Sequence, residues 1–132
     1  MNERIIKIIN EMDRYMPSGT MYDFLYAHRK RIKFNVSLSK KDREEDIEVL
    51  DLGNRSMHCL RRAGFDTVGS LLEAIAVTGD EKSKDKLMKL RNLGIKSADE
   101  ILLMIMCHQF LTLPEKERGQ FVQQIIEINS AS

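Results

Sequence analysis

The chain has 132 residues, of which 42% are hydrophobic and 31% charged, a balance typical of a globular protein rather than a disordered one. Basic and acidic residues nearly cancel to a formal net charge of +1, so any contact with nucleic acid must come from a local arrangement of charge. No apolar run approaches the roughly 18–20 residues of a membrane-spanning helix, and the first residues do not read as a signal peptide, so we expect a cytoplasmic protein without membrane contact.

Apolar residues recur at helical spacing along nearly the whole chain, which predicts an all-α protein. A first helix is expected over about 2–15, ended by Pro17-Ser18-Gly19. A second helix begins near Thr20, whose hydroxyl can cap it, and its apolar side extends to Ile32. The pattern is lost over about 34–46, which indicates a polar linker or a weak helix.

The helical pattern resumes with a helix over about 54–63, in which Met57, Leu60 and Ala63 are expected to face the core. Gly64 is a natural end for this helix, because glycine accepts the left-handed conformation that often follows a helix.

Asp66 or Thr67 is expected to cap the next helix. A long helix then begins at Ser97, which forms an S-x-x-E capping box with Glu100. The final helix opens at Pro114, a residue favoured at the first helical position.

These patterns predict three parts. The first is a helical extension and linker over 1–46, the second a domain over 47–110, and the third a carboxyl-terminal helix over 111–132.

The cysteines and histidines do not indicate a metal site, a cofactor or an enzyme. Cys59 and Cys107 lie in apolar helical patterns without a metal-ligand spacing, so both are expected to be buried thiols. The three histidines, His28, His58 and His108, lie far apart in the sequence with no nucleophile or H-E-x-x-H spacing nearby.

The segment Arg91-Asn92-Leu93-Gly94-Ile95-Lys96-Ser97 has the pattern of a helix-hairpin-helix. Gly94 has no side chain, so a phosphate can approach the backbone closely. The N–H groups at the start of the following helix and its dipole favour an anion, and Lys96 and Ser97 add a charge and a hydroxyl. Such a site grips phosphate without reading sequence. A purely structural turn is the alternative interpretation.

Two blocks, 54–72 and 90–101, together resemble the C-terminal domain of the bacterial RNA polymerase alpha subunit. That family has an R-S-x-x-C-L-K-R-x-G-I-x-T-V-G-D-L-L block followed by a K-x-x-N-x-G-x-K-S-x-x-E-I block. Both blocks occur here in this order. The region that contains them covers about half of the chain. The resemblance implies a compact helical bundle of the helix-hairpin-helix, SAM-like type, with extra amino- and carboxyl-terminal helices.

The resemblance also implies that the domain binds the minor groove of A·T-rich double-stranded DNA and contacts transcription factors. The residues that match the family's DNA surface are Arg55, His58, Cys59, Gly94, Lys96, Ser97 and Glu100.

By this resemblance Arg55 enters the minor groove, and His58 stands where many members have asparagine. Cys59 lies at the edge of the surface. The hairpin residues touch backbone phosphate, and Glu100 orients its neighbours.

Some features depart from the family. Ile95 replaces the second lysine of the hairpin, and the segment between the blocks is longer, with 78–83 as the expected insertion. The alpha-subunit assembly domain has no counterpart here, so we expect a stand-alone protein, encoded by a bacterium, a phage or a mobile element, of undetermined oligomeric state.

A basic stretch precedes these blocks and contains Arg29, Lys30, Arg31 and Lys33. It is either a second phosphate-contacting arm or a solvated helix face, and the second interpretation is favoured.

The sequence therefore predicts a DNA-binding protein acting in transcription. The alternative is a protein-interaction module that docks on RNA polymerase, a sigma factor or another regulator, with a vestigial or decoy DNA surface. A DNA-repair accessory is a more remote possibility, against which the first block argues.

Overall fold

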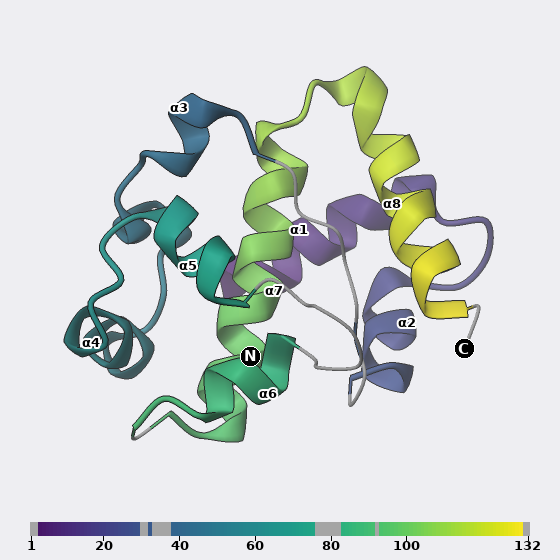
Figure 1. The fold of residues 1–132 in the computed structure, drawn as a ribbon. Coiled ribbons are helices and arrows are strands. Elements are labelled where there is room, and N and C mark those ends of the chain that lie inside the picture. Colours follow the sequence, from purple (N-terminus) through teal and green to yellow (C-terminus); the bar gives the residue numbers. More distant parts are fainter. Residues whose placement is uncertain (1–2, 30–31, 33–37, 76–82, 92, 131–132) are drawn as a thin grey trace. The chain divides into compact units, whose positions relative to one another are not determined.

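The computed structural model describes residues 3–29, 32, 38–75, 83–91 and 93–130, and its regular elements are helices (Figure 1), which confirms the predicted all-α class. In these residues the one extended pairing is an isolated antiparallel bridge between Asp46 and Thr67. The elements are α1 (Glu3–Met12), η1 (Asp13–Tyr15), α2 (Met21–Ala27), α3 (Lys40–Arg43), η2 (Ile47–Leu50), α4 (Asn54–Arg62), α5 (Val68–Ile75), α6 (Ser83–Met88), α7 (Ile95–Thr112) and α8 (Glu115–Ser130).

The chain divides into two compact units. The central unit lies within 36–105, and the flanking unit combines residues within 1–35 with residues within 106–132. Helix α7 contributes its first part, up to Ile105, to the central unit and its last part to the flanking unit. The division into 1–46, 47–110 and 111–132 stays a prediction.

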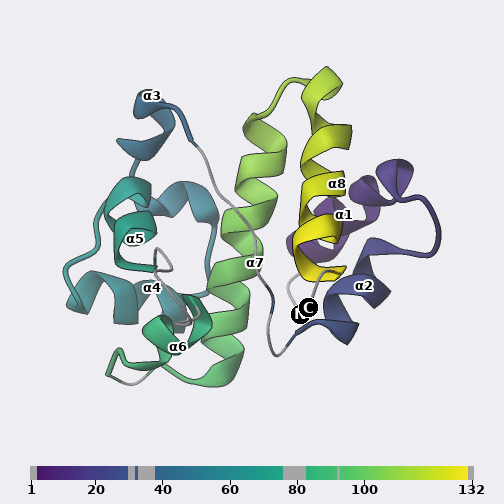
Figure 2. The same ribbon diagram turned by 45° about the vertical axis from the view of Figure 1, so that its right-hand side comes forward.

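In the central unit, α5 lies between α3 and α6 and contacts both (Figures 1 and 2). The segment before η2 lies beside the turn before α5, since Ile47 donates its N–H to Asp66 O at 3.0 Å and Val68 donates to Glu45 O at 2.9 Å. Apolar side chains from all parts of this unit form its core. The fully buried ones include Ile47, Leu50, Leu60, Val68, Leu71, Leu87, Ala98, Ile101 and Leu102.

Local signals set the ends of α4 and α5. Gly64 follows α4 with φ of 92°, which confirms the predicted stop. Thr67 caps α5, because its Oγ1 accepts from the Ser70 N–H at 3.1 Å while Ser70 Oγ accepts from the Thr67 N–H at 3.3 Å. The prediction that Met57 and Ala63 face the core is wrong. Ser56 and Cys59 occupy the inner face together with Leu60, so the helix is rotated relative to the expected stripe.

The start of α7 also differs from the prediction. The helix begins at Ile95 rather than Ser97, and the Ala98 N–H donates to Gly94 O at 3.0 Å, which puts Gly94 at the N-cap position. The predicted Ser97–Glu100 capping box is therefore wrong. The Glu100 carboxylate instead accepts a hydrogen bond from Gly53.

In the flanking unit, α1 buries Ile5, Ile8, Ile9 and Met12 against its neighbours. Thr20 caps α2 as predicted, since its Oγ1 accepts from the Asp23 N–H at 3.2 Å.

Helix α2 ends at Ala27, so the expectation that its apolar side extends to Ile32 is wrong. The reason is local. The His28 ring nitrogen Nδ1 lies 2.8 Å from Phe24 O, and Arg29 Nη1 donates to Tyr26 O at 2.8 Å. Arg29 takes the Tyr26 carbonyl with both its N–H and its side chain, and a continuing helix would use that carbonyl for the next turn, whereas Phe24 O still accepts the helical bond from the His28 N–H.

The end of α7 and the start of α8 meet through Arg118. Its Nε donates to Phe110 O at 3.1 Å and to Leu113 O at 3.2 Å, and its Nη2 donates to Leu111 O at 3.2 Å. A cation at a helix carboxyl end satisfies open carbonyls and complements the helix dipole.

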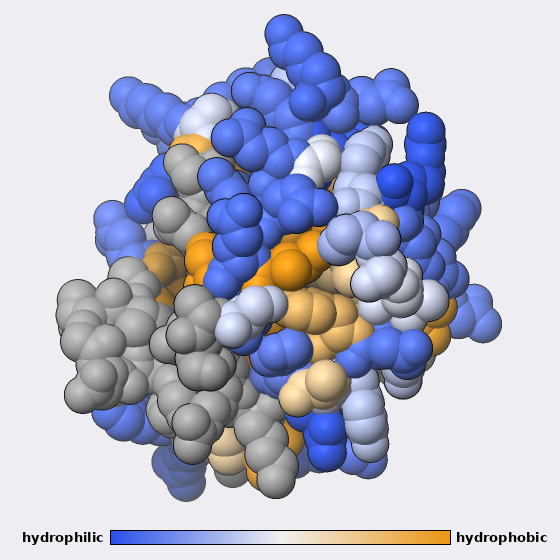
Figure 3. Space-filling view, turned by 90° about the vertical axis from the view of Figure 1, so that its right-hand side faces the viewer, coloured by the Kyte–Doolittle hydropathy of each residue, from blue (hydrophilic) through white to orange (hydrophobic). Residues whose placement is uncertain are grey.

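Figure 3 views the side of the molecule on which Figure 1 labels α2 and α8, where mostly hydrophilic side chains surround a small apolar area. Among its described residues, the flanking unit has these large exposed hydrophobic side chains: Ile6, Tyr22, Tyr26, Leu111 and Ile128. No helix of the described part is both long and apolar enough to span a membrane.

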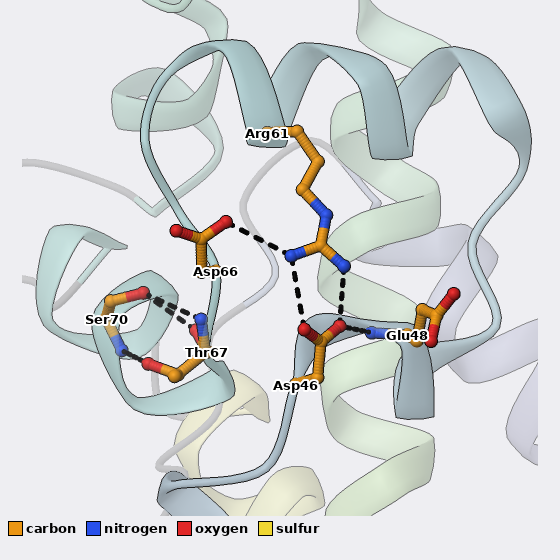
Figure 4. A network of polar contacts seen from close by, with 6 residues as sticks. All are labelled: Asp46, Glu48, Arg61, Asp66, Thr67 and Ser70. Carbon is orange, nitrogen blue, oxygen red and sulfur yellow. Dashed lines mark hydrogen bonds and ion pairs between the residues drawn. The ribbon is translucent and has the colours of Figure 1, made fainter.

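A polar network joins three segments of the central unit (Figure 4). Arg61 on α4 donates to Asp46 at 2.6 Å and 3.2 Å and to Asp66 at 3.1 Å. Asp46 also caps η2, because its Oδ1 accepts from the Glu48 N–H at 2.9 Å. The Arg61 bond and the Glu48 N–H hold the pKa of Asp46 below its ordinary value of 3.8.

We predict that Gly69→Ala destabilises the protein. A Cβ at residue 69 would lie 2.9 Å from Arg43 O and 3.1 Å from Arg43 Cβ, so the backbones of α3 and α5 must separate. Alanine favours a helix by roughly 0.5–1 kcal/mol, but overpacking of this kind costs about 1–3 kcal/mol. A urea titration should give a lower free energy of unfolding than the parent. The control is Gly94→Ala, where nothing lies within 4 Å of the added carbon. Equal stability of the two variants would contradict the steric argument.

We also predict a pH dependence that originates at Asp46. Because its folded-state pKa is lowered, its contribution to stability is present above the unfolded value of about 3.9 and is lost as pH falls through the folded value. Both partners are partly exposed, so the effect is small. Thermal midpoints should show Asp46→Asn less stable than the parent at neutral pH, with the difference shrinking below about pH 4. Asparagine keeps the Oδ1 acceptor for η2 but removes the charge and the Oδ2 acceptor of Arg61 Nη1. A difference that does not change with pH would refute the assignment.

Candidate nucleic-acid interface

The start of α4 presents two of the predicted side chains to solvent. Arg55 and His58 are exposed and lie three residues apart, which places them on one face of the helix. The residues between and beside them, Ser56 and Cys59, are buried and anchor that turn to the core. Cys59 therefore lies beneath this face rather than on it.

The hairpin before α7 presents an open backbone. Leu93 is buried and fixes the turn, while Gly94, Ile95 and Lys96 are exposed and Ser97 is partly exposed. Nothing lies within 4 Å of a Cβ built on Gly94, so an incoming group meets no protein atom there. The first N–H groups of an 18-residue helix follow directly. Asn92 lies outside the described residues.

A hydrogen bond joins these two places. Gly53, at the N-cap of α4, has no side chain to cap the helix, and its N–H donates to Glu100 Oε1 at 3.0 Å. Glu100 thus supplies from α7 an acceptor that is missing locally, and its charge lies at the positive end of α4. The bond ties the helix start that carries Arg55 to the second turn of the helix that carries Lys96.

The arginines near these residues differ in how they are occupied. Arg61 is held by Asp46 and Asp66. Among the described residues no carboxylate pairs with Arg55, Arg62 or Arg91, and all three side chains are exposed. Arg91 was not among the predicted site residues, although its position inside the hairpin sequence was a signal for it.

The predicted basic arm is described only at Arg29, which is exposed and belongs to the flanking unit, not to the unit that carries Arg55. Lys30, Arg31 and Lys33 lie outside the described residues.

The two cysteines are buried thiols that form no disulfide, as predicted. Burial raises the pKa of the Cys107 thiol to about 12, so this thiol stays protonated at neutral pH. In the residues that the structure describes, no three His, Cys, Asp or Glu side chains come together as metal ligands.

Comparison with known proteins places the interface in a family. Residues 35–105 match the family described as the C-terminal domain of the bacterial RNA polymerase alpha chain. The DNA-directed RNA polymerase subunit alpha of Moorella thermoacetica is 38% identical over 79 residues, which cover 54% of this chain and 23% of that protein. The subunit of the same name from Carboxydothermus hydrogenoformans is 46% identical over 59 residues, covering 45% of this chain and 16% of that protein.

The chain thus spans less than a quarter of the length of these curated relatives. The search of solved structures found no match. The matched segment contains α3 to α6, the first part of α7, and with them every described residue of the two predicted blocks. Because the family match covers more than half of its residues, the chain belongs to the family of bacterial RNA polymerase alpha C-terminal domains, which are non-catalytic modules for DNA binding in transcription.

Proposed function

We propose that this chain, by itself, binds A·T-rich double-stranded DNA in transcription, with Arg55 in the minor groove and the hairpin on backbone phosphate. The observation that carries the proposal is the Gly53–Glu100 hydrogen bond at 3.0 Å, which ties the exposed Arg55 turn to the helix that opens at Gly94. Both parts lie in the segment that matches the family.

The exposed turn of α4 suits a minor groove of A·T base pairs. A narrow A-tract groove has an enhanced negative potential that attracts an inserted arginine, and Arg55 is exposed without a carboxylate partner in the described part of the protein. His58, one turn along the same face, can donate a ring N–H to the acceptors that adenine and thymine present there.

The hairpin suits a phosphate group. A phosphate oxygen can approach the backbone at Gly94, where no protein atom lies within 4 Å of an added carbon, and meet the first N–H groups of α7. Lys96 adds a positive charge beside it. Such contacts position a protein on DNA and are sensitive to salt, whereas the minor-groove contacts of Arg55 favour particular sequences.

In this proposal Glu100 is a positioning residue. Its carboxylate accepts from Gly53 at 3.0 Å, and through that bond it fixes where the Arg55 turn begins. It acts on DNA through α4 and needs no contact with the duplex.

The curated relatives are subunits of RNA polymerase by name. We therefore also propose that polymerase or a transcription factor accompanies the chain on DNA. If the chain acts only by docking on a protein, it should bind no duplex, and the following test would show this.

Binding of an A·T-rich and a G·C-rich duplex should be measured by fluorescence anisotropy at several salt concentrations. We predict that the parent prefers the A·T-rich duplex, and that Arg55→Ala loses about 1–3 kcal/mol of binding free energy and most of the preference. Lys96→Gln should weaken both duplexes alike and reduce the slope of log K against log salt by about 0.9. Gly94→Ala should weaken binding while the fold is kept, because its methyl group meets no protein atom.

The matched control is Arg62→Ala, since Arg62 is an exposed arginine at the other end of α4. It should cost less than Arg55→Ala. Equal losses in both variants, or a parent that binds neither duplex, would refute the proposal.

A separate prediction concerns Glu100. Glu100→Ala removes the acceptor for Gly53 and should weaken DNA binding by a few fold, although it removes a negative charge that by itself would repel phosphate. Glu100→Gln keeps an acceptor oxygen and should retain more affinity than Glu100→Ala. The amide signal of Gly53 in a nitrogen–proton correlation spectrum should shift in the alanine variant. Tighter DNA binding by both variants would show that charge, not position, is what Glu100 contributes.

A further inference from the structure

Positive charge is concentrated in one stretch of the sequence. Residues 24–41 contain six Lys and Arg side chains and no Asp or Glu, while the rest of the chain has 15 basic residues against 20 acidic ones. A chain with a net charge of +1 therefore has a strongly basic stretch. A local excess of this kind favours a polyanion as the partner.

Helix α2 leads into this stretch and has an aromatic exposed side. Tyr22 is 42% and Tyr26 58% exposed, and their spacing of four residues places them on one face. The neighbouring face of the helix, about 100° around its axis, buries Met21 and Leu25. Burial of Met21 and Leu25 fixes the rotation of α2, and this rotation leaves Tyr22 and Tyr26 exposed to solvent.

Arg29 is held against this face. Its Cζ lies 4.1 Å from the centroid of the Tyr26 ring, and its Nη1 donates to Tyr26 O at 2.8 Å. In the described residues no carboxylate pairs with it, and the edge formed by its Nε and Nη2 has no acceptor. Such an edge matches two phosphate oxygens, and the ring that holds the guanidinium lowers the entropy lost on binding.

Arg14 in the same unit provides a comparison. It also lies over a tyrosine, with its Cζ 5.9 Å from the Tyr15 centroid, but its Nη2 is 4.0 Å from Glu115 Oε1. Arg14 lies outside the acid-free stretch and has a carboxylate partner, whereas Arg29 has neither an acidic neighbour in sequence nor an ion pair among the described residues.

We propose that Tyr22, Tyr26 and Arg29 form a second DNA contact, which binds the sugar–phosphate backbone of the same duplex. These residues precede the segment that matches the family and belong to the flanking unit. The occupant is duplex DNA rather than an acidic protein, because binding of DNA by the central unit raises the effective concentration of phosphate for the flanking unit of the same chain. The inference rests in this respect on the proposed function.

The test is a salt titration of duplex binding with matched variants. Arg29→Gln should reduce the slope of log K against log salt by about 0.9, as expected when one phosphate is no longer neutralised. Arg29→Lys keeps the charge and should keep the slope. Tyr26→Ala removes the ring but leaves the backbone acceptor of Arg29, so it should weaken binding with the slope unchanged. Arg14→Gln removes the same charge from a paired site and should leave both quantities as in the parent.

The outcomes separate this inference from the proposed function. If Arg55→Ala loses binding while Arg29→Gln has the slope of the parent, the second contact does not exist and the proposed function stands. If Arg29→Gln and Arg14→Gln reduce the slope of log K against log salt equally, the reduction comes from the loss of one positive charge anywhere on the unit. The inference is then overturned. If Arg55→Ala binds like the parent, the proposed function fails. Circular dichroism melts establish that each variant is folded. If Arg29→Gln does not fold, the binding of Tyr26→Ala provides the test.

Discussion

The candidate interface depends on one hydrogen bond between residues 47 positions apart in the sequence. Gly53 begins α4 without a side chain that could accept from the first N–H groups, and Glu100 accepts from it instead. A helix start is thereby completed by another helix. The same bond sets where Arg55 lies relative to Lys96, so the cap of one helix and the geometry of a two-part surface are a single constraint.

Around this bond, steric and ionic contacts hold the central unit. Gly69 allows the backbone at Arg43 to lie close to α5. Arg61 links α4 to the residues just before η2 and α5 through Asp46 and Asp66. The three arginines of α4 are chemically alike in the sequence but differ in the fold. Arg61 is committed to internal contacts, whereas Arg55 and Arg62 face solvent.

Apolar spacing predicted the all-α class and most of the long helices, because burial of a stripe dictates where a helix can lie, but it did not predict the end of α2 or the start of α7. Turn chemistry likewise predicted the helix end at Gly64, and it gave Thr67 as one of two candidates for the cap of α5. The rotation of α4 was not predicted, since Ser56 and Cys59 replace Met57 and Ala63 on the inner face and small polar side chains give a weak signal. The sequence did not predict the hydrogen-bond partner of Glu100. Its spacing from Ser97 matches a local capping box, whereas its partner Gly53 is distant in the sequence.

The near-zero net charge predicts that any contact with nucleic acid comes from a local arrangement of charge, and the structure shows how charges are distributed among the described residues. Some carboxylates of the described residues are occupied within the fold, as Asp46 and Asp66 are by Arg61 and Glu100 is by Gly53. Exposed cations such as Arg55 and Lys96 have no such partner among the described residues. Attraction to phosphate falls steeply with distance in salt, so the charges that lie closest to a duplex determine binding and the total does not.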